Sequence, residues 1–218
     1  CNKGDQPQIA LELLSGMQVQ QILPDEVTYG AAISSCAKAE GNGWETALAL
    51  LAEMQERRLS AGVMQIGAAI SSCSGAESWP YALLLIEAMQ RRGMEPSVIA
   101  YSSAMNSCVK GQASRQVFGL FDEMRRRRLE PGTYAYGAAI GACRVDGRPQ
   151  AALALFHELR GSRVETDVQL YDAVLAALST EQGWEQAVTM LGAMRHEAVT
   201  PGQAACGSAV SACGTGSP

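Results

Sequence analysis

Residues 98–131 read VIAYSSAMNSCVKGQASRQVFGLFDEMRRRRLEP, and the rest of the 218-residue chain is built from copies of this stretch. Each copy has a run of small residues that ends in Cys, then a turn, an apolar segment that ends in Met, and a basic cluster. Cys, or Leu in one copy, recurs with spacings of 37, 35, 35, 35 and 35 residues, and Met, or Leu in one copy, recurs with the same spacings. A period of this length indicates a stack of structural repeats rather than one or two globular domains.

The period divides the chain into five full repeats between two partial ones, and we expect all of them to form one continuous solenoid. The predicted boundaries are 1–25, 26–62, 63–97, 98–132, 133–167, 168–202 and 203–218. The first segment matches the second half of a repeat, and the last segment matches the first half. Because neither terminal segment has the polar face of a capping repeat, we expect the chain to be a piece of a longer protein.

Each repeat is predicted to form two helices separated by a turn that contains Gly. In the third repeat, apolar residues at spacings of three, four and seven place the first helix from about Ile99 to Val109. The second helix runs from about Ser114 to Arg127, and its predicted core face consists of Val117, Leu120, Phe121 and Met124. Three polar residues stand where first helices would be capped: Asp25, Ser97 and Asp167. No stretch alternates with a period of two long enough to predict a strand.

A 35-residue helix-turn-helix repeat of this kind resembles the pentatricopeptide repeat family, and the resemblance covers nearly the whole chain. The residues that carry it are Val27-Thr28-Tyr29 with Tyr101 and Tyr136 at the Tyr position, Ile33, Ile70 and Ile140 four residues later, Ala47-Leu48, the Met series, and Pro at the joints. The related tetratricopeptide family has a period of 34 residues. The resemblance implies an all-α fold, a right-handed α-solenoid superhelix of helix-turn-helix repeats.

The resemblance also implies a function, which is the binding of single-stranded RNA in a chloroplast or mitochondrion, with one nucleotide for each repeat. Such binding would serve RNA processing, stability or translation. By resemblance, the base-reading pairs are Gly30 with Gly62, Gly67 with Ser97, Ser102 with Gly132, Gly137 with Asp167, and Asp172 with Gly202. The base-packing positions are Val27, Met64, Ile99, Tyr134 and Gln169.

Every one of these base-reading pairs contains at least one Gly. Glycine has no side chain that could donate or accept a hydrogen bond at a base edge. We therefore expect weak base specificity if the chain binds RNA. The alternative is a helical scaffold that binds a protein or peptide on its concave face.

Positive charge gathers at the predicted ends of the second helices, although the net charge of the chain is −5. Eleven of the 17 Lys and Arg residues lie there: Arg57, Arg58, Arg91, Arg92, Arg125, Arg126, Arg127, Arg128, Arg160, Arg163 and Arg195. A cation is favourable at the C-terminus of a helix, but these residues also form a basic edge. Three further cations near the ends of first helices are either phosphate contacts or ordinary solvated charges: Lys38, Lys110 and Arg144.

Nothing in the sequence predicts an enzyme, a cofactor, a metal site or a small-molecule substrate. The two histidines, His157 and His196, have no neighbouring pattern of a catalytic triad or metal site. Five of the seven cysteines occupy one repeated position and no CxxC pair occurs, so we expect small apolar packing residues rather than disulfides. The apolar runs are too short to span a membrane.

Overall fold

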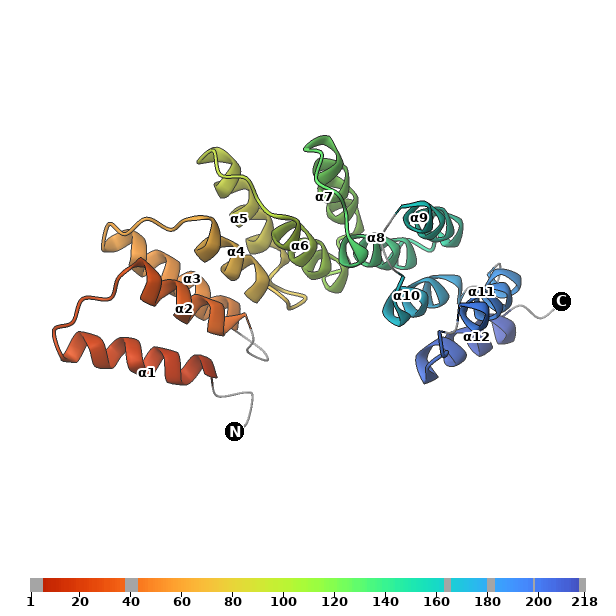
Figure 1. Cartoon of the computed structure of the whole chain (residues 1–218), viewed down its shortest axis with the longest axis horizontal. Coiled ribbons are helices and arrows are strands. Elements are labelled where there is room, and N and C mark those ends of the chain that lie inside the picture. The colour runs from red at the N-terminus through yellow and green to blue at the C-terminus, as the bar shows by residue number, and fades with distance from the viewer. Residues whose placement is uncertain (1–5, 38–42, 163–165, 180–182, 198, 216–218) are drawn as a thin grey trace. The chain divides into compact units, whose positions relative to one another are not determined.

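The computed structural model describes residues 6–37, 43–162, 166–179, 183–197 and 199–215. Over these residues the chain forms twelve α-helices and no strand (Figure 1). The helices are α1 (Gln6–Val19), α2 (Glu26–Cys36), α3 (Gly43–Glu56), α4 (Val63–Ser72), α5 (Trp79–Arg91), α6 (Val98–Lys110), α7 (Ser114–Arg126), α8 (Thr133–Val145), α9 (Pro149–Gly161), α10 (Val168–Leu178), α11 (Trp184–His196) and α12 (Gln203–Thr215). The predicted all-α fold is confirmed.

The chain divides into two compact units, residues 1–111 and 112–218. In the first unit, α2, α4 and α6 are the first helices of their repeats, and α4 packs against both α2 and α6. The second helices α3 and α5 each contact the first helix before them and the one after them. In the second unit, α8, α10 and α12 are related in the same way, and α9 and α11 take the places of the second helices. Each unit is therefore a stack of helix pairs that contact their neighbours in sequence.

Side-chain caps fix where several first helices begin. Asp25, Ser97 and Asp167 each accept a hydrogen bond from the backbone N–H three residues later, at 2.8, 3.2 and 2.8 Å. Such a bond satisfies one of the N–H groups that have no partner within the helix. The three predicted N-caps are confirmed.

The second helices end in a repeated hydrogen-bonding pattern. In three successive repeats, the N–H five residues after the repeated Met donates to the Met carbonyl, at 2.8, 2.9 and 3.0 Å. This is the 6→1 hydrogen bond of a Schellman motif, and it places one residue in the left-handed conformation. These residues are Arg58, Gly93 and Arg128, with φ of 59°, 69° and 57°.

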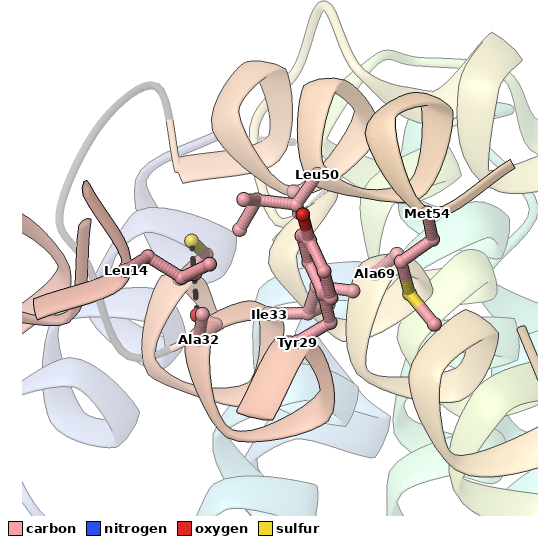
Figure 2. Close-up of a cluster of buried hydrophobic side chains, with 9 residues drawn as sticks. Leu14, Tyr29, Ala32, Ile33, Leu50, Met54 and Ala69 are labelled. Atoms are coloured by element: carbon pink, nitrogen blue, oxygen red, sulfur yellow. Dashed lines mark hydrogen bonds between the residues drawn. The ribbon is translucent and has the colours of Figure 1, made fainter. Parts of the chain in front are cut away.

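Small and apolar side chains fill the space between the helices of each unit. Figure 2 shows one such cluster, in which Leu14, Tyr29, Leu50, Met54 and Ala69 come from α1, α2, α3 and α4. The predicted core face of α7 is confirmed, because its four residues are all buried.

The thiols at the repeated Cys position are free, as predicted. Cys36, Cys73, Cys108 and Cys143 are buried and unbonded. Cys213 occupies the same repeated position but is exposed. The helix that carries it, α12, packs against α10 and α11.

Two turn glycines are required by close contacts. A Cβ atom on Gly111 would lie 2.2 Å from Cδ1 of Trp79, and one on Gly183 would lie 2.1 Å from the carbonyl oxygen of Leu178. Trp79 therefore packs over the turn that follows α6. Trp44 instead stacks on Tyr81, with ring centroids 4.8 Å apart.

Candidate nucleic-acid interface

The second residue of each first helix projects a side chain into solvent. In the first unit these residues are Val27, Met64 and Ile99, and their exposed fractions are 75%, 83% and 72%. In the second unit they are Tyr134, which is 79% exposed, and Gln169, which is also exposed. A large apolar side chain is thus exposed at the same position of four repeats. All five residues predicted to pack against bases are thus free to do so.

The first predicted base-reading pair, Gly30 with Gly62, lies against the side chain of Gln65. Gln65 Oε1 accepts a hydrogen bond from the backbone N–H of Gly62 at 3.1 Å, and Gln65 Nε2 donates to the carbonyl oxygen of Glu26 at 3.1 Å. A Cβ atom on Gly30 would lie 3.2 Å from Nε2. The structure thus brings both glycines together around one amide group.

The other glycines of the predicted pairs have open space in front of them. A Cβ atom would meet nothing within 4 Å at Gly67, Gly132, Gly137 or Gly202. No side chain therefore lies against these four glycines as that of Gln65 lies against Gly30.

Three of the four polar residues in the predicted pairs form hydrogen bonds within their own helices. Ser97 and Asp167 are the N-caps described above, and the Ser102 hydroxyl donates to the Val98 carbonyl at 2.8 Å. Asp172 differs, because its Oδ1 atom is buried and has no hydrogen-bond partner among the described residues. These contacts leave few polar groups for reading a base.

The three predicted phosphate contacts lie in different settings. Lys110 is exposed, and its Nζ donates to the carbonyl oxygen of Ser74 at 2.7 Å. Arg144 is exposed near the end of α8. Lys38 lies outside the described residues.

Six of the eleven arginines of the predicted basic edge pair with carboxylates. Arg57 and Arg91 pair with a Glu four residues earlier on their own helices, at 2.8 and 2.9 Å. Arg126 and Arg127 share Glu123, at 2.5 and 2.6 Å. The sequence places these carboxylates on the second helices, but it did not predict this degree of pairing. The expectation of a basic edge needs correction, because much of its charge is compensated.

Arg125 and Arg160 take part in a different arrangement, which joins successive helices of the second unit. Arg125 pairs with Glu158, whose Oε1 also accepts a 2.9 Å hydrogen bond from the Tyr136 hydroxyl. The Arg125 guanidinium also lies 4.4 Å from the centroid of the Phe121 ring. These contacts join neighbouring helices of the second unit. Because Arg125 is already paired with Glu158, it is not a free cation that could bind a phosphate.

Burial and the same neighbours change the acidity of several groups. Hydrogen bonding to Arg125 lowers the pKa of Glu158, and burial raises the pKa of Tyr136. Burial also raises the pKa of Cys73 to about 11 and that of Cys108 to about 12. These thiols are protonated at neutral pH, which does not suit a nucleophile or a metal ligand.

Gln65 is the residue of this site that the sequence analysis missed. Gln65 occupies the third position of its first helix, and at this position most repeats carry an apolar residue. The residues at this position are Thr28, Gln65, Ala100, Ala135, Leu170 and Ala205. Gln65 is the one long polar side chain in this series, and it could have been found by aligning the repeats with one another.

The described residues contain no cluster of three or more His, Cys, Asp or Glu side chains that could hold a metal ion. None of their helices is both long enough and apolar enough to cross a membrane.

The chain is similar to known repeat proteins in sequence and in fold. Residues 84–144 match the family model described as pentatricopeptide repeat domain, and residues 134–164 match the one described as PPR repeat. No curated protein sequence matches the chain.

Two solved structures show the same fold. One is the pentatricopeptide repeat protein PPR10 in complex with an 18-nt psaJ RNA element, with 22% identity, a TM-score of 0.53 and coverage of 94% of this chain and 33% of that chain. The other is the PPR domain of Arabidopsis thaliana protein-only RNase P 1 in complex with tRNA, with 16% identity, a TM-score of 0.67 and coverage of 80% of this chain and 91% of that chain. This chain therefore spans about a third of the length of the PPR10 chain. The similarities confirm the predicted fold of helical repeats.

Proposed function

Because this chain belongs to the pentatricopeptide repeat family, we propose that it binds single-stranded RNA along the exposed ends of its first helices. The observation that carries the proposal is the repeated exposure of Val27, Met64, Ile99 and Tyr134 at one helical position. Unstacked bases of a single strand present flat apolar faces, and such faces are stabilised by contact with apolar or aromatic side chains. A duplex keeps its bases stacked, so it would not use these side chains.

The proposed binding has weak base specificity. Four of the glycines in the predicted reading pairs face open space, and the Ser97 and Asp167 side chains cap helices. Base discrimination requires donors and acceptors at the base edge, and these positions supply few. Affinity would come mainly from base packing and from phosphate contacts by cations such as Lys110 and Arg144.

We extend the proposal to a chloroplast or mitochondrial location and to a role in RNA processing, stability or translation. Family resemblance supports this part. A fluorescent fusion of the full-length protein, imaged in cells with organelle markers, tests the location, and a cytosolic signal would contradict it.

The experiment that tests RNA binding compares a labelled single-stranded 20-mer with the same sequence in a duplex, by fluorescence anisotropy at low salt. We expect the single strand to bind and the duplex to bind at least tenfold more weakly. Tyr134→Ala should weaken single-strand binding by about 1 kcal/mol or more, the usual contribution of one base stacked on an aromatic ring. Leu84→Ala is the matched control, because Leu84 is an exposed apolar residue of a second helix, α5.

One observation favours the alternative of a scaffold for a protein or peptide. The chain has a net charge of −5, and many of its helix-end arginines are already paired with carboxylates. A peptide with apolar side chains could contact these same exposed side chains without any phosphate contact. If wild-type protein binds no single strand at 50 mM salt, the RNA proposal fails and the scaffold becomes the better explanation.

A further inference from the structure

We infer that Gln65 reads the edge of one RNA base, and that Gly30 and Gly62 leave the space in which its amide group lies. The inference rests on the proposed RNA-binding function and adds to it a residue that determines specificity. It concerns one position within the first unit, where α2 and α4 pack against each other.

The amide of Gln65 occupies the place that the side chains of a reading pair would otherwise fill. A Cβ atom on Gly30 would lie 3.2 Å from Gln65 Nε2, and a Cβ atom on Gly62 would lie 3.4 Å from Gln65 Oε1. The first of these distances is shorter than ordinary van der Waals contact, so a Cβ atom at position 30 would displace the amide by a few tenths of an ångström. The two glycines therefore suit a reading group that comes from the following repeat.

Hydrogen bonds hold this amide in a fixed orientation. Its Oε1 accepts from the Gly62 N–H, and its Nε2 donates to the Glu26 carbonyl oxygen. The Glu26 side chain in turn accepts a 2.9 Å hydrogen bond from the backbone N–H of Ser60, in the segment that leads to Gly62. A side chain fixed in this way loses little conformational freedom when it binds a ligand.

The amide still has unused hydrogen-bonding capacity. A Gln side chain has two N–H donors and two acceptor lone pairs, and the contacts above use one of each. The residue is half-buried, and the hydrogen bond from its Nε2 to the Glu26 carbonyl oxygen is exposed to solvent. A neighbouring donor and acceptor match adenine, which presents the N7 acceptor beside the N6 donor. On that N6/N7 edge guanine presents two acceptors and each pyrimidine presents a single polar group, so an amide that meets this edge selects adenine. The Watson–Crick edge would not select a base, because there all four bases present a donor beside an acceptor.

The exposed apolar residues on either side support this assignment. Met64 immediately precedes Gln65, and Val27 immediately follows Glu26, to which the amide is bonded. Both are among the residues proposed to pack against bases, and α2 and α4 are neighbours. A base held between Val27 and Met64 would have its edge directed towards the Gln65 amide.

The other repeats do not reproduce this arrangement. Ala100, Ala135, Leu170 and Ala205 occupy the third position elsewhere and are buried. Among the glycines of the predicted reading pairs, only Gly30 and Gly62 have a neighbouring side chain this close. The Gln65 site is thus a local feature rather than a property of every repeat.

The test measures the affinity of four 12-mers of U, one unchanged and three with a single A, C or G at the centre. Wild-type protein should prefer the A-containing strand by about tenfold, the discrimination expected of one bidentate pair. Gln65→Ala should bring this ratio to about one. Gln65→Glu keeps the acceptor for the Gly62 N–H but loses the donor, and it should prefer the C-containing strand, whose N4 group donates.

Gln203→Ala is the matched control, because Gln203 is an exposed amide at the start of the first helix α12, and it should keep the wild-type ratio. Circular dichroism shows whether each variant keeps its helices, and Gln65→Glu tests the inference if Gln65→Ala does not fold. If no strand binds wild-type protein, the proposed function itself fails. If the strands bind but the A preference is absent, or persists in Gln65→Ala, RNA binding stands and the role of Gln65 is wrong.

Discussion

The hydroxyl of Tyr171 donates a 2.6 Å hydrogen bond to Glu197 Oε2, and it does so at the same place in the repeat where Tyr136 donates to Glu158. Tyr136 and Tyr171 are 35 residues apart. In both cases an Arg at the end of the preceding second helix, Arg125 or Arg160, pairs with the same carboxylate. Glu158 thus joins α7, α8 and α9, and Glu197, the residue that follows α11, joins α9 and α10 to the end of α11.

Aromatic contacts beside these Tyr, Glu and Arg side chains also recur after 35 residues. Phe121 meets Tyr136 edge to face at 5.2 Å between centroids, and Phe156 meets Tyr171 at 5.1 Å. Edge-to-face pairs are favourable because the positive edge of one ring meets the negative face of the other. In the first unit, Gln90 Nε2 donates to the Tyr101 hydroxyl at 3.1 Å.

Removal of the shared carboxylate should destabilise the second unit. In Glu158→Ala, the hydroxyl of the buried Tyr136 and the guanidinium of Arg125 both lose their partner, so we expect the free energy of unfolding to fall by roughly 1 to 2 kcal/mol. Urea unfolding followed by circular dichroism measures the change.

Glu87→Ala is the control for this prediction. Glu87 forms an exposed ion pair with Arg91 on its own helix, and such pairs contribute about 0.3 to 0.5 kcal/mol. Equal losses in the two variants would show that Glu158 is only another surface ion pair.

Replacement of an arginine in the left-handed conformation by glycine should stabilise the chain. Arg58 and Arg128 have φ of 59° and 57°, and Gly93 occupies the equivalent position of the intervening repeat. The left-handed conformation is unfavourable by about 1 kcal/mol or more for a residue with a Cβ atom, but not for Gly. Arg58→Gly and Arg128→Gly should each raise the free energy of unfolding by up to about 1 kcal/mol, because the greater freedom of Gly in the unfolded chain offsets part of the gain.

Gly93→Ala is the reverse experiment and should destabilise by a similar amount. A Cβ atom at Gly93 meets nothing within 4 Å, so backbone conformation is the only source of this effect. No loss of stability in Gly93→Ala would contradict the explanation.

Thiol reactivity should separate the buried cysteines from those of α12. Cys36, Cys73, Cys108 and Cys143 are buried, and burial raises the pKa of each thiol, so little of the reactive thiolate exists at pH 8. Cys206 and Cys213 are exposed.

Maleimide labelling of native protein, followed by peptide mass spectrometry, should modify Cys206 and Cys213 much faster than the four buried residues. Labelling in denaturant is the control and should modify all of them. Fast native labelling of Cys73 or Cys108 would show that the helices of the first unit open readily.

The features that recur from repeat to repeat could be predicted from the sequence. The N-caps Asp25, Ser97 and Asp167 could be predicted because a capping side chain bonds to the backbone of its own helix, three residues away. The burial of Cys108 could be predicted because its neighbours in the helix have the same apolar spacing in each repeat. Local rules of this kind apply to each copy separately.

Features that depend on one repeat meeting the next could not be predicted in the same way. The contact between Gly30 and Gln65 joins residues 35 positions apart in the chain, and only one repeat has a long polar side chain at that position. The pairing of Arg125 with Glu158 likewise depends on the directions in which two long side chains extend. Periodicity indicates that such side chains are near one another, but not which of them meet.

The final prediction concerns the electrostatic part of the proposed RNA binding. For a single strand, each phosphate neutralised by a cation contributes about −0.7 to the slope of log K against log salt concentration. Replacement of Lys38, Lys110 and Arg144 together by Ala should therefore weaken all RNAs alike and make the slope less steep by about 2. Anisotropy titrations between 50 and 200 mM salt measure the slope. Because Lys110 also binds the Ser74 carbonyl, the single variant Arg144→Ala separates phosphate binding from any local structural effect.

The double variant Arg126→Ala/Arg127→Ala is the control for charge. It removes two cations, but both are paired with Glu123 in the free protein, so their contribution to phosphate binding should be small. We expect its salt slope to match that of the wild type within error. If this variant flattens the slope more than the triple variant does, RNA follows the ends of the second helices instead, and the proposed path along the first helices is wrong.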